Sequence, residues 1–515
     1  MNAQSDSAIQ NKLLRLVMRF FQADWSGALL AILILAISIE IATDGKPFFH
    51  PSNLMTILNN SAAIGIVAGG MTLVILTAGI DLSVGSVMGM TAALTGYVAS
   101  FWGFPPLMAI AFGLGLGALI GYFHGTLVAK FGMPAFIVTL AGLSIWRGTG
   151  HLSTGAQATP QLPEAFNAFG RFNPLQPIRD AFRDGTLPEW LNFLGQFLDD
   201  NWREFFRTFQ MSMIIFVVFF IVLSLIVSNT IYGRYVYAIG SNESGARQAG
   251  INTVRYKMMT YVFCSMSAAF GALLFLGRAP YAKSDYGVMW ELDAIAAVVI
   301  GGTSLFGGRG TIWGTFMGVI LIKLINNGLT LAQLNTFWQM VVTGMIILIA
   351  VGLDIVRQSR DPEAVRKMLA AVGGAMAFFT LMTPASQFLR GAISLHEHKS
   401  SVALRDSGVS LAPGQNDRLL SGAEVETMQS LISTNLLPSL IALVVMALAV
   451  WAVMRAGRLQ TLIACGGFVA LAVIMSLIGY ATTVPFLVLG GVAMVGSLFV
   501  KTLFDRAQAM NEAPA

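Results

Sequence analysis

The sequence predicts an all-α protein, a bundle of helices that crosses a membrane many times. Hydrophobic residues make up 55% of the 515 residues and charged residues only 11%, whereas soluble domains carry about 25% charged residues. The apolar stretches are continuous and roughly 17 to 25 residues long, the length that a helical span needs. Strands of a transmembrane barrel would instead alternate over about ten residues. The net charge of +5 is not gathered in a basic tract, so no nucleic-acid partner is expected.

Ten spans are predicted before residue 356 and four after it. The first ten lie near residues 27–43, 61–80, 84–100, 105–129, 133–148, 211–229, 258–277, 291–308, 311–327 and 337–355, and the other four lie near 368–389, 434–454, 460–479 and 484–500. Lys and Arg are more frequent in the short loops of one side, and basic loop residues collect on the cytoplasmic side. We therefore expect both termini in the cytoplasm. The opening residues lack the apolar core and cleavage site of a signal peptide, so the first span is expected to be a retained anchor.

The expected organisation has three parts. Residues 1–24 form a cytoplasmic N-terminal segment, residues 25–356 a core of ten spans, and residues 357–515 a C-terminal accessory membrane module. Within the core, residues 149–209 form an outer loop whose apolar spacing predicts one or two amphipathic helices at the membrane surface. A lid over the outer mouth is the alternative. Residues 230–257 form a cytoplasmic loop.

The fourth span carries a glycine at every fourth position from residue 113. Gly113, Gly117, Gly121 and Gly125 therefore share one face of the helix. Such spacing lets two helix backbones approach closely in a membrane, where lipid supplies no hydrophobic drive between helices. The stripe predicts close packing against another helix, with a gating surface as the alternative.

Two polar, glycine-bearing breaks interrupt the apolar runs, at residues 79–86 and 301–315. Irregular backbone at membrane depth is tolerated only where protein buries it or where it lines an aqueous cavity. Asp81 is either a helix N-cap or a group on the translocation path, and both interpretations stay open. The candidate residues of the translocation path are Asp81, Ser83, Thr303 and Ser304.

The polar stretch YAIGSNESGARQAGI, residues 237–251, lies between two long apolar runs. Ser241 or Asn242 can cap the start of a helix, and Glu243 suits the positive end of the helix dipole. Gly250 can adopt the left-handed conformation that ends a helix. The stretch therefore predicts a short helix of about two turns on a cytoplasmic loop.

This short helix suggests a docking surface for a partner. Gly245 and Ala246 offer a small face, while Glu243 and Arg247 place opposite charges one helical turn apart. An ordinary connection between two spans is the alternative. The candidate docking residues are Gly240, Ser241, Asn242, Glu243, Gly245, Ala246, Arg247 and Gly250.

Several chemistries find no support in the sequence. Gly302 and Gly307 have the spacing of a P-loop, but Gly308 and Arg309 occupy the positions that need Lys and Ser or Thr. The chain also lacks HExxH and GxSxG motifs, and its two cysteines lie in separate predicted spans. We therefore expect no enzyme activity, no metal site and no cofactor.

Three motifs follow one another along the chain. They are GMTLVILTAGIDLSVGSVMGMTAALTG from Gly70, YAIGSNESGARQAGI from Tyr237 and AIAAVVIGGTSLFGGRGTIWGT from Ala294. Together they resemble the permease subunits of carbohydrate ABC importers of the ribose, xylose, arabinose and galactose type. The resemblance covers roughly residues 25–356, and the four C-terminal spans have no match in it.

The resemblance implies a ten-helix permease in a bacterial inner membrane, working as a dimer with a second copy of the chain. It implies two further partners, a periplasmic sugar-binding protein and a separate ATPase subunit. The transported molecule would be a monosaccharide or a related polyol. The stretch from Glu243 to Gln248 matches the cytoplasmic coupling loop of this family, which agrees with the docking interpretation.

Two other classes of function remain as alternatives. An ion-coupled secondary transporter or channel should carry ionisable residues in the middle of its spans, because such groups are costly in lipid and mark ion sites. Asp81 is the one residue that fits, since the other charged residues of the spans lie near the span ends. The third class is a membrane-embedded enzyme, and no catalytic motif in the sequence supports it.

Overall fold

A computed structural model describes four stretches of the chain, residues 48–166, 170–186, 188–191 and 207–331. It also describes isolated positions at 36, 40, 339, 340, 343, 344, 347, 348, 351, 352, 354, 425 and 426. The described stretches hold helices and no strand, and the helices named below belong to one compact unit. Apart from isolated positions, the spans predicted at 27–43 and 337–355, and the four C-terminal spans, lie outside the described residues.

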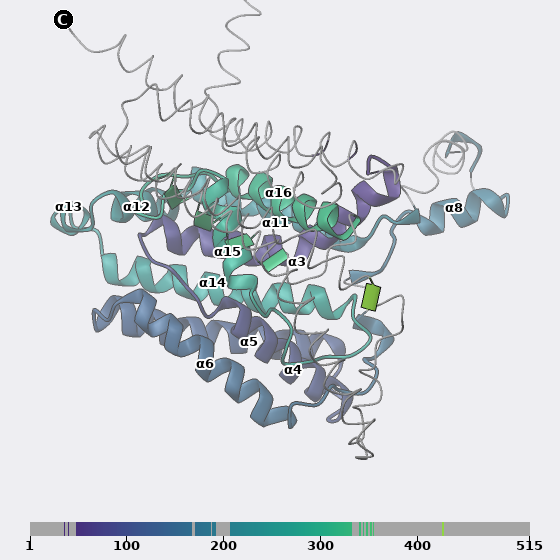
Figure 1. The fold of residues 1–515 in the computed structure, drawn as a ribbon, viewed down its shortest axis with the longest axis horizontal. Helices are drawn as coiled ribbons and strands as arrows, with labels where there is room; N and C mark the ends of the chain where they lie inside the picture. Colours follow the sequence, from purple (N-terminus) through teal and green to yellow (C-terminus); the bar gives the residue numbers. More distant parts are fainter. Residues whose placement is uncertain are drawn as a thin grey trace, which may run out of the picture. The chain divides into compact units, whose positions relative to one another are not determined.

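The described helices are shown in chain order in Figure 1. They are α3 (Pro51–Leu76), α4 (Val84–Ser100), α5 (Pro106–Gly125) with a π-helical turn (Thr126–Lys130), α6 (Ala135–Thr154), α8 (Gln176–Arg183), α11 (Met211–Asn229), α12 (Ile231–Ser241), α13 (Glu243–Gln248), α14 (Thr253–Leu276), α15 (Trp290–Ile300) and α16 (Ile312–Leu331). Within the described part, five helices are long and apolar enough to cross a membrane: α3, α5 with its π turn, α11, α14 and α16. The predicted all-α, polytopic membrane class is confirmed.

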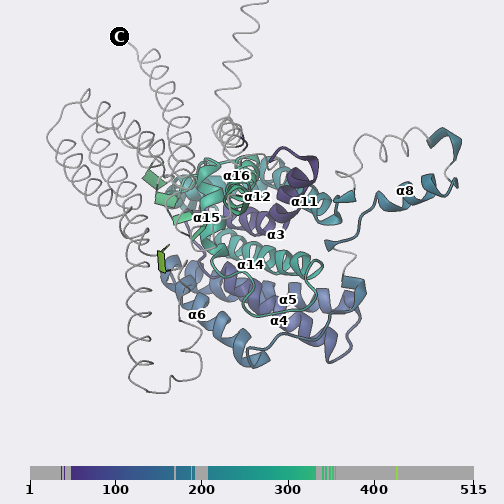
Figure 2. The ribbon, with the colours of Figure 1, turned by 45° about the vertical axis from the view of Figure 1, so that its right-hand side comes forward.

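Helices α3 and α14 form the centre of this unit. α14 packs against α3, α4 and α5, while α3 also contacts α11, α15 and α16. Both ribbon views show α14 between α3 and α5 (Figure 1, Figure 2). Small residues let neighbours approach α3 from every side; they are Ser61, Ala62, Ala63, Gly65, Ala68, Gly69 and Gly70, all buried.

The glycine stripe of α5 lies against α14, as the spacing predicts. A methyl group added at Gly121 would lie 2.6 Å from Cα of Val262, and one at Gly125 would lie 2.9 Å from Cα of Met258. Carbon atoms in packed interiors stay about 3.5–4.0 Å apart. Only glycine therefore fits at these contacts, and the packing interpretation of the stripe is confirmed.

Two span predictions match closely and two need correction. The limits of α4 and α11 agree with the predicted 84–100 and 211–229. Helix α3 begins at Pro51 rather than near residue 61. Its polar first turns are only partly buried, but they are hydrogen-bonded to distant parts of the chain; Nδ2 of Asn59, for example, donates to the carbonyl of Thr208 at 2.8 Å. The span predicted at 291–308 is wrong as a continuous helix, since α15 ends at Ile300.

The outer loop is only partly helical in the described residues. Helix α6 continues to Thr154, so the loop starts later than the predicted 149. α8 and two 3-10 turns, Glu164–Phe166 and Glu189–Leu191, follow. The amphipathic helix expected toward residue 209 lies mostly outside the described residues.

Candidate coupling segment and pathway residues

Three side-chain caps divide residues 230–257 into successive helices. Oγ1 of Thr230 accepts from the backbone N–H of Gly233 at the start of α12, at 3.5 Å. Oδ1 of Asn242 accepts from the N–H of Gly245 at 2.9 Å and so caps α13. Asn252 caps α14 in the same way. Such caps satisfy backbone donors that a helix start leaves unpaired.

The predicted short helix is confirmed as α13, with one refinement at its start. Asn242 is the cap, while Ser241 is the last residue of α12. Gly250 has φ of +84° just after α13, the left-handed conformation predicted there. The sequence did not predict α12 as a helix of its own.

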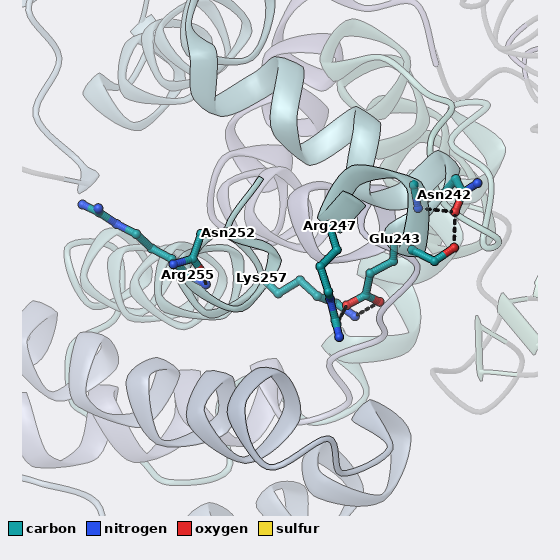
Figure 3. Close-up of polar contacts among 8 residues, drawn as sticks. Asn242, Glu243, Arg247, Asn252, Arg255 and Lys257 are labelled. Carbon is teal, nitrogen blue, oxygen red and sulfur yellow. Dashed lines mark hydrogen bonds and ion pairs between the residues drawn. The ribbon is translucent and has the colours of Figure 1, made fainter. Parts of the chain in front are cut away.

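Glu243 ties α13 to the start of α14. Its carboxylate lies 2.8 Å from Nζ of Lys257, which is 19% exposed, and 3.4 Å from the guanidinium of Arg247, which is 68% exposed. Figure 3 shows Glu243 between these two cations. The pair with Arg247 was predicted from spacing, but the closer and more buried pair with Lys257 joins two helices and was not.

The remaining candidates of this segment divide into an inner and an outer group. Ala246 is buried in its own chain at 7% exposure, and Gly245 is half-buried. Ser244, Arg247 and Gln248 are exposed. The surface of α13 that is available to a partner is therefore the polar face formed by these exposed residues.

Helix α12 packs on α14 through aromatic rings. Tyr235 and Tyr256 meet edge to face with ring centroids 4.9 Å apart, and Tyr232 meets Phe263 at 5.5 Å. Burial raises the pKa of the Tyr232 phenol above its usual value, so this group stays neutral at physiological pH. α12 is thus held firmly between the membrane helices and α13.

Asp81 lies in the first break, fully buried, and orders the turn into α4. Its Oδ1 accepts from the backbone N–H of Ser83 at 2.9 Å and from Oγ of Ser83 at 2.5 Å. This is an Asx-type turn before the helix rather than the side-chain N-cap that the sequence suggested as one interpretation.

A hydrogen-bonded chain extends from Asp81 into two further helices. Nε1 of Trp146 on α6 donates to Nε2 of His124 on α5 at 2.9 Å. Because an indole N–H can only donate, the other ring nitrogen of a neutral His124 carries the proton. That nitrogen, Nδ1, lies 3.4 Å from Oγ of Ser83. Sequence reasoning missed His124 and Trp146, since nothing local connects them to the break.

The first residues of the second break, up to Ser304, are also largely buried, and Asp354 binds this part of the turn. Oδ2 of Asp354 accepts from Oγ of Ser304 and from the N–H of Leu305, both at 3.1 Å. Thr303 is 1% exposed and lies against Gly310. Ser304 is thus hydrogen-bonded in the turn, while the hydroxyl of Thr303 is buried and has no hydrogen-bond partner among the described residues.

The end of α3, the second break and α12 come together at one place. The N–H of Gly308 donates to the carbonyl of Leu76 at 2.9 Å. Oη of Tyr237 donates to the carbonyl of Gly310 at 2.7 Å. Gly240 lies between Leu76 and Gly308. Of the predicted residues, Gly240 and Ser241 therefore adjoin the end of α3 and the second break, while Asn242 caps α13, in which the other predicted residues up to Arg247 lie.

A second polar contact lies between α15 and α16. Nζ of Lys323 is 3.3 Å from the carboxylate of Asp293, with both side chains about 15% exposed or less. Lys323 also lies over the ring of Trp290, 5.6 Å from its centroid. Two largely buried opposite charges compensate each other, so this pair positions the helices without leaving a free ion site.

Several helices that are long and apolar enough to cross a membrane, joined by polar breaks and a small polar helix, are the features of a multi-pass membrane protein. Residues 53–351 match the family described as the branched-chain amino acid transport system / permease component, and the chain belongs to this family. No solved structure matches the chain.

Sugar permeases are among the similar proteins. The fructose import permease protein FrcC of Rhizobium meliloti is 34% identical over 68% of this chain and 91% of its own length. The ribose import permease protein RbsC of Escherichia coli (strain K12) is 35% identical over 66% of this chain and 97% of its own length. The xylose transport system permease protein XylH of the same strain is 30% identical over 64% of this chain and 91% of its own length.

These matches confirm the predicted membership among permease subunits of carbohydrate ABC importers. Such a subunit is a multi-pass protein of the bacterial inner membrane and is not itself an enzyme, because ATP is hydrolysed on a separate subunit. The family match ends at residue 351. The relatives leave roughly a third of this chain unmatched.

Proposed function

We propose that this chain forms the membrane pathway of an ABC importer for a monosaccharide or related polyol. The names of its relatives concern fructose, ribose and xylose, and shared family membership supports extending this substrate class to the present chain. A periplasmic binding protein delivers the sugar, an ABC ATPase drives transport, and a second copy of the chain completes the pathway.

Ten helices from residues 25–356 form the permease in this proposal, with both termini in the cytoplasm. Residues 357–515 form an accessory membrane module of four further helices. The two breaks line the cytoplasmic end of the pathway, with Asp81, Ser83, Thr303 and Ser304 as its polar groups. Their burial at the ends of α3 and α15 supports this placement, because polar, irregular backbone persists at membrane depth only where protein or an aqueous path surrounds it.

The observation that carries the proposal is the geometry of α13. A docking helix must keep its shape before its partner arrives, and here a cap at Asn242 and the ion pair of Glu243 with Lys257 fix it. It must also present a polar rim, which Arg247 and Gln248 provide. The α13 segment therefore meets both requirements of the coupling loop to an ATPase, with Ala246 as its inner anchor.

The test is an assay of the reconstituted complex of permease, ATPase and binding protein. Gly245→Trp and Arg247→Glu should keep normal membrane abundance but lose at least tenfold in co-purified ATPase, because a bulky group or a reversed charge opposes docking. Lys130→Glu, an exposed charge reversal on the turn between α5 and α6, is the matched control and should change neither.

Uptake of radiolabelled ribose, fructose and xylose into liposomes tests the transport itself. Uptake should require the ATPase and ATP, and it should survive ionophores. Full ATPase binding by both α13 variants would reduce the segment to an ordinary connection. Uptake by the purified chain alone, abolished by ionophores, would instead favour the ion-coupled carrier.

A further inference from the structure

Backbone-to-backbone contacts join the end of α12 to the second break and to the end of α3, just before the first break. We call this place the glycine junction; it consists of Leu76, Ala78, Tyr237, Gly240, Ser241, Gly307, Gly308 and Gly310. Its members come from the end of α3, from the end of α12 and from the turn between α15 and α16. Segments more than 60 residues apart in sequence therefore meet here.

No flexible side chain separates the backbones at the centre of the junction. A methyl group added at Gly240 would overlap the carbonyl oxygen of Leu76 and lie 2.5 Å from the nitrogen of Gly308. One added at Gly308 would lie 2.7 Å from Cα of Ser241, and one at Gly307 would lie 2.8 Å from the nitrogen of Ala78. Contacts between backbones transmit displacement directly, because no rotamer change can absorb it.

Two hydrogen bonds fix the three segments to one another. The bond from Gly308 N–H to the Leu76 carbonyl, 2.9 Å, joins the end of α3, just before the first break, to the second break. The bond from Tyr237 Oη to the Gly310 carbonyl, 2.7 Å, joins α12 to the second break. Gly307, Gly308 and Gly310 all have positive φ, at +84°, +70° and +146°. This conformation strains any residue with a Cβ, so the turn keeps its shape only with glycine.

The position of the junction relates α13 to the ends of membrane helices. Only Asn242 separates α12 from α13. α3 ends at Leu76 and α15 ends at Ile300, just before their breaks. A shift of α13 along the axis of α12 therefore reaches the end of α3 and the turn after α15 at the same time.

We infer that the glycine junction transmits the movement of α13 to both breaks together. The inference rests on the proposed docking of an ATPase on α13. Gly240, Gly308 and Tyr237 are then positioning residues: they contact neither ATP nor sugar, but they make the two breaks move as one. The junction acts at the cytoplasmic end of the pathway.

The experiment measures movement of the second break without needing the sugar. Arg309 is exposed in that break, so Arg309→Cys gives a labelling site for a maleimide, with the unsubstituted chain as background. In the complex with its ATPase, the labelling rate should change at least threefold between the nucleotide-free state and the state trapped with ATP and vanadate. Adding Gly240→Ala should abolish this change while the ATPase still co-purifies and still hydrolyses ATP.

Gly115→Ala is the matched control, because a methyl group there meets nothing within 4 Å among the described residues; the nucleotide-dependent change should persist. Tyr237→Phe adds no atoms and covers the case in which Gly240→Ala does not fold. It should reduce the nucleotide-dependent change about twofold or more, since one of the two hydrogen bonds is lost.

Three outcomes would overturn the inference: a labelling rate that nucleotide does not alter, an unchanged response in Gly240→Ala, or an unchanged response in Tyr237→Phe. A failure of the proposed ATPase docking looks different. There, Gly245→Trp and Arg247→Glu would keep the ATPase bound, whatever the junction variants do.

Discussion

Loss of the α13 cap gives a sharp prediction. Oδ1 of Asn242 accepts from the N–H of Gly245 at 2.9 Å and from Oγ of Ser244 at 2.8 Å. Replacing such a cap with Ala costs about 1 kcal/mol, within a range of 0.5–2. α13 has only six residues, too few to be stable alone. Loss of the cap should therefore make α13 less ordered and leave the stability of the packed spans unchanged.

One kcal/mol corresponds to about a fivefold change in an equilibrium constant. Asn242→Ala should therefore weaken ATPase binding about fivefold, because part of the binding energy must first order the helix. The measurement is a titration of the purified ATPase against the permease in detergent or nanodiscs, read as a dissociation constant. Membrane abundance and thermal unfolding of the permease should stay unchanged.

Two matched variants separate the cap from a direct contact. Asn242→Ser keeps an oxygen that can accept the same hydrogen bond, so binding should be close to wild type. Asn252→Ala removes the equivalent cap of α14, whose 24 residues are held by packing, and should affect binding little. Equal weakening by Asn242→Ala and Asn242→Ser would refute the reasoning, because it would mean that the amide itself touches the partner.

Three further predictions follow from the packing and the charges. Gly121→Ala should lower the stability of the permease by about 1–3 kcal/mol, because the added methyl group overlaps α14. Gly115→Ala should raise the stability by up to about 1 kcal/mol. Both are measured by thermal melting in detergent, and a change of the same sign in both variants would contradict the packing argument. Lys257→Met removes an ion pair worth at most about 1 kcal/mol, since the partner Glu243 is 39% exposed and its charge is screened by solvent. We expect weaker ATPase binding and an unchanged melting temperature of the permease. Truncation after about residue 360 should leave part of the uptake intact, and a stably inserted truncate without any uptake would show that the C-terminal module is essential.

Local signals made the coupling segment predictable. The cap at Asn242, the stop at Gly250 and the pair of Glu243 with Arg247 all lie within a few residues of one another, so the sequence alone indicates the helix. The glycine stripe of α5 was equally readable, because its period matches the helix. The helix that the stripe packs against, α14, could not be predicted, because it lies far along the chain.

Long-range partners explain what the sequence could not show. The polar start of α3 looks like a loop until the carbonyl of Thr208 is placed beside Asn59. Likewise, the hydrogen bond from Tyr237 to Gly310 spans 73 positions, and no local pattern announces it. The hydropathy that predicted one long span over residues 291–308 also averaged over the turn that ends α15 at Ile300.

The burial of α3 has a consequence for the order of biogenesis. Every described helix that covers it, α11, α14, α15 and α16 among them, is synthesised after it. At roughly 5–20 residues per second, α14 leaves the ribosome on the order of ten to forty seconds after α3. Until Thr208 has been synthesised, the side-chain amide of Asn59 lacks the carbonyl to which it donates in the folded protein. Thr72 donates within α3 to the carbonyl of Ala68, and only its contact with the hydroxyl of Thr315 waits for α16. We therefore expect the nascent α3 to remain beside the insertion machinery until the helices that cover it have been synthesised.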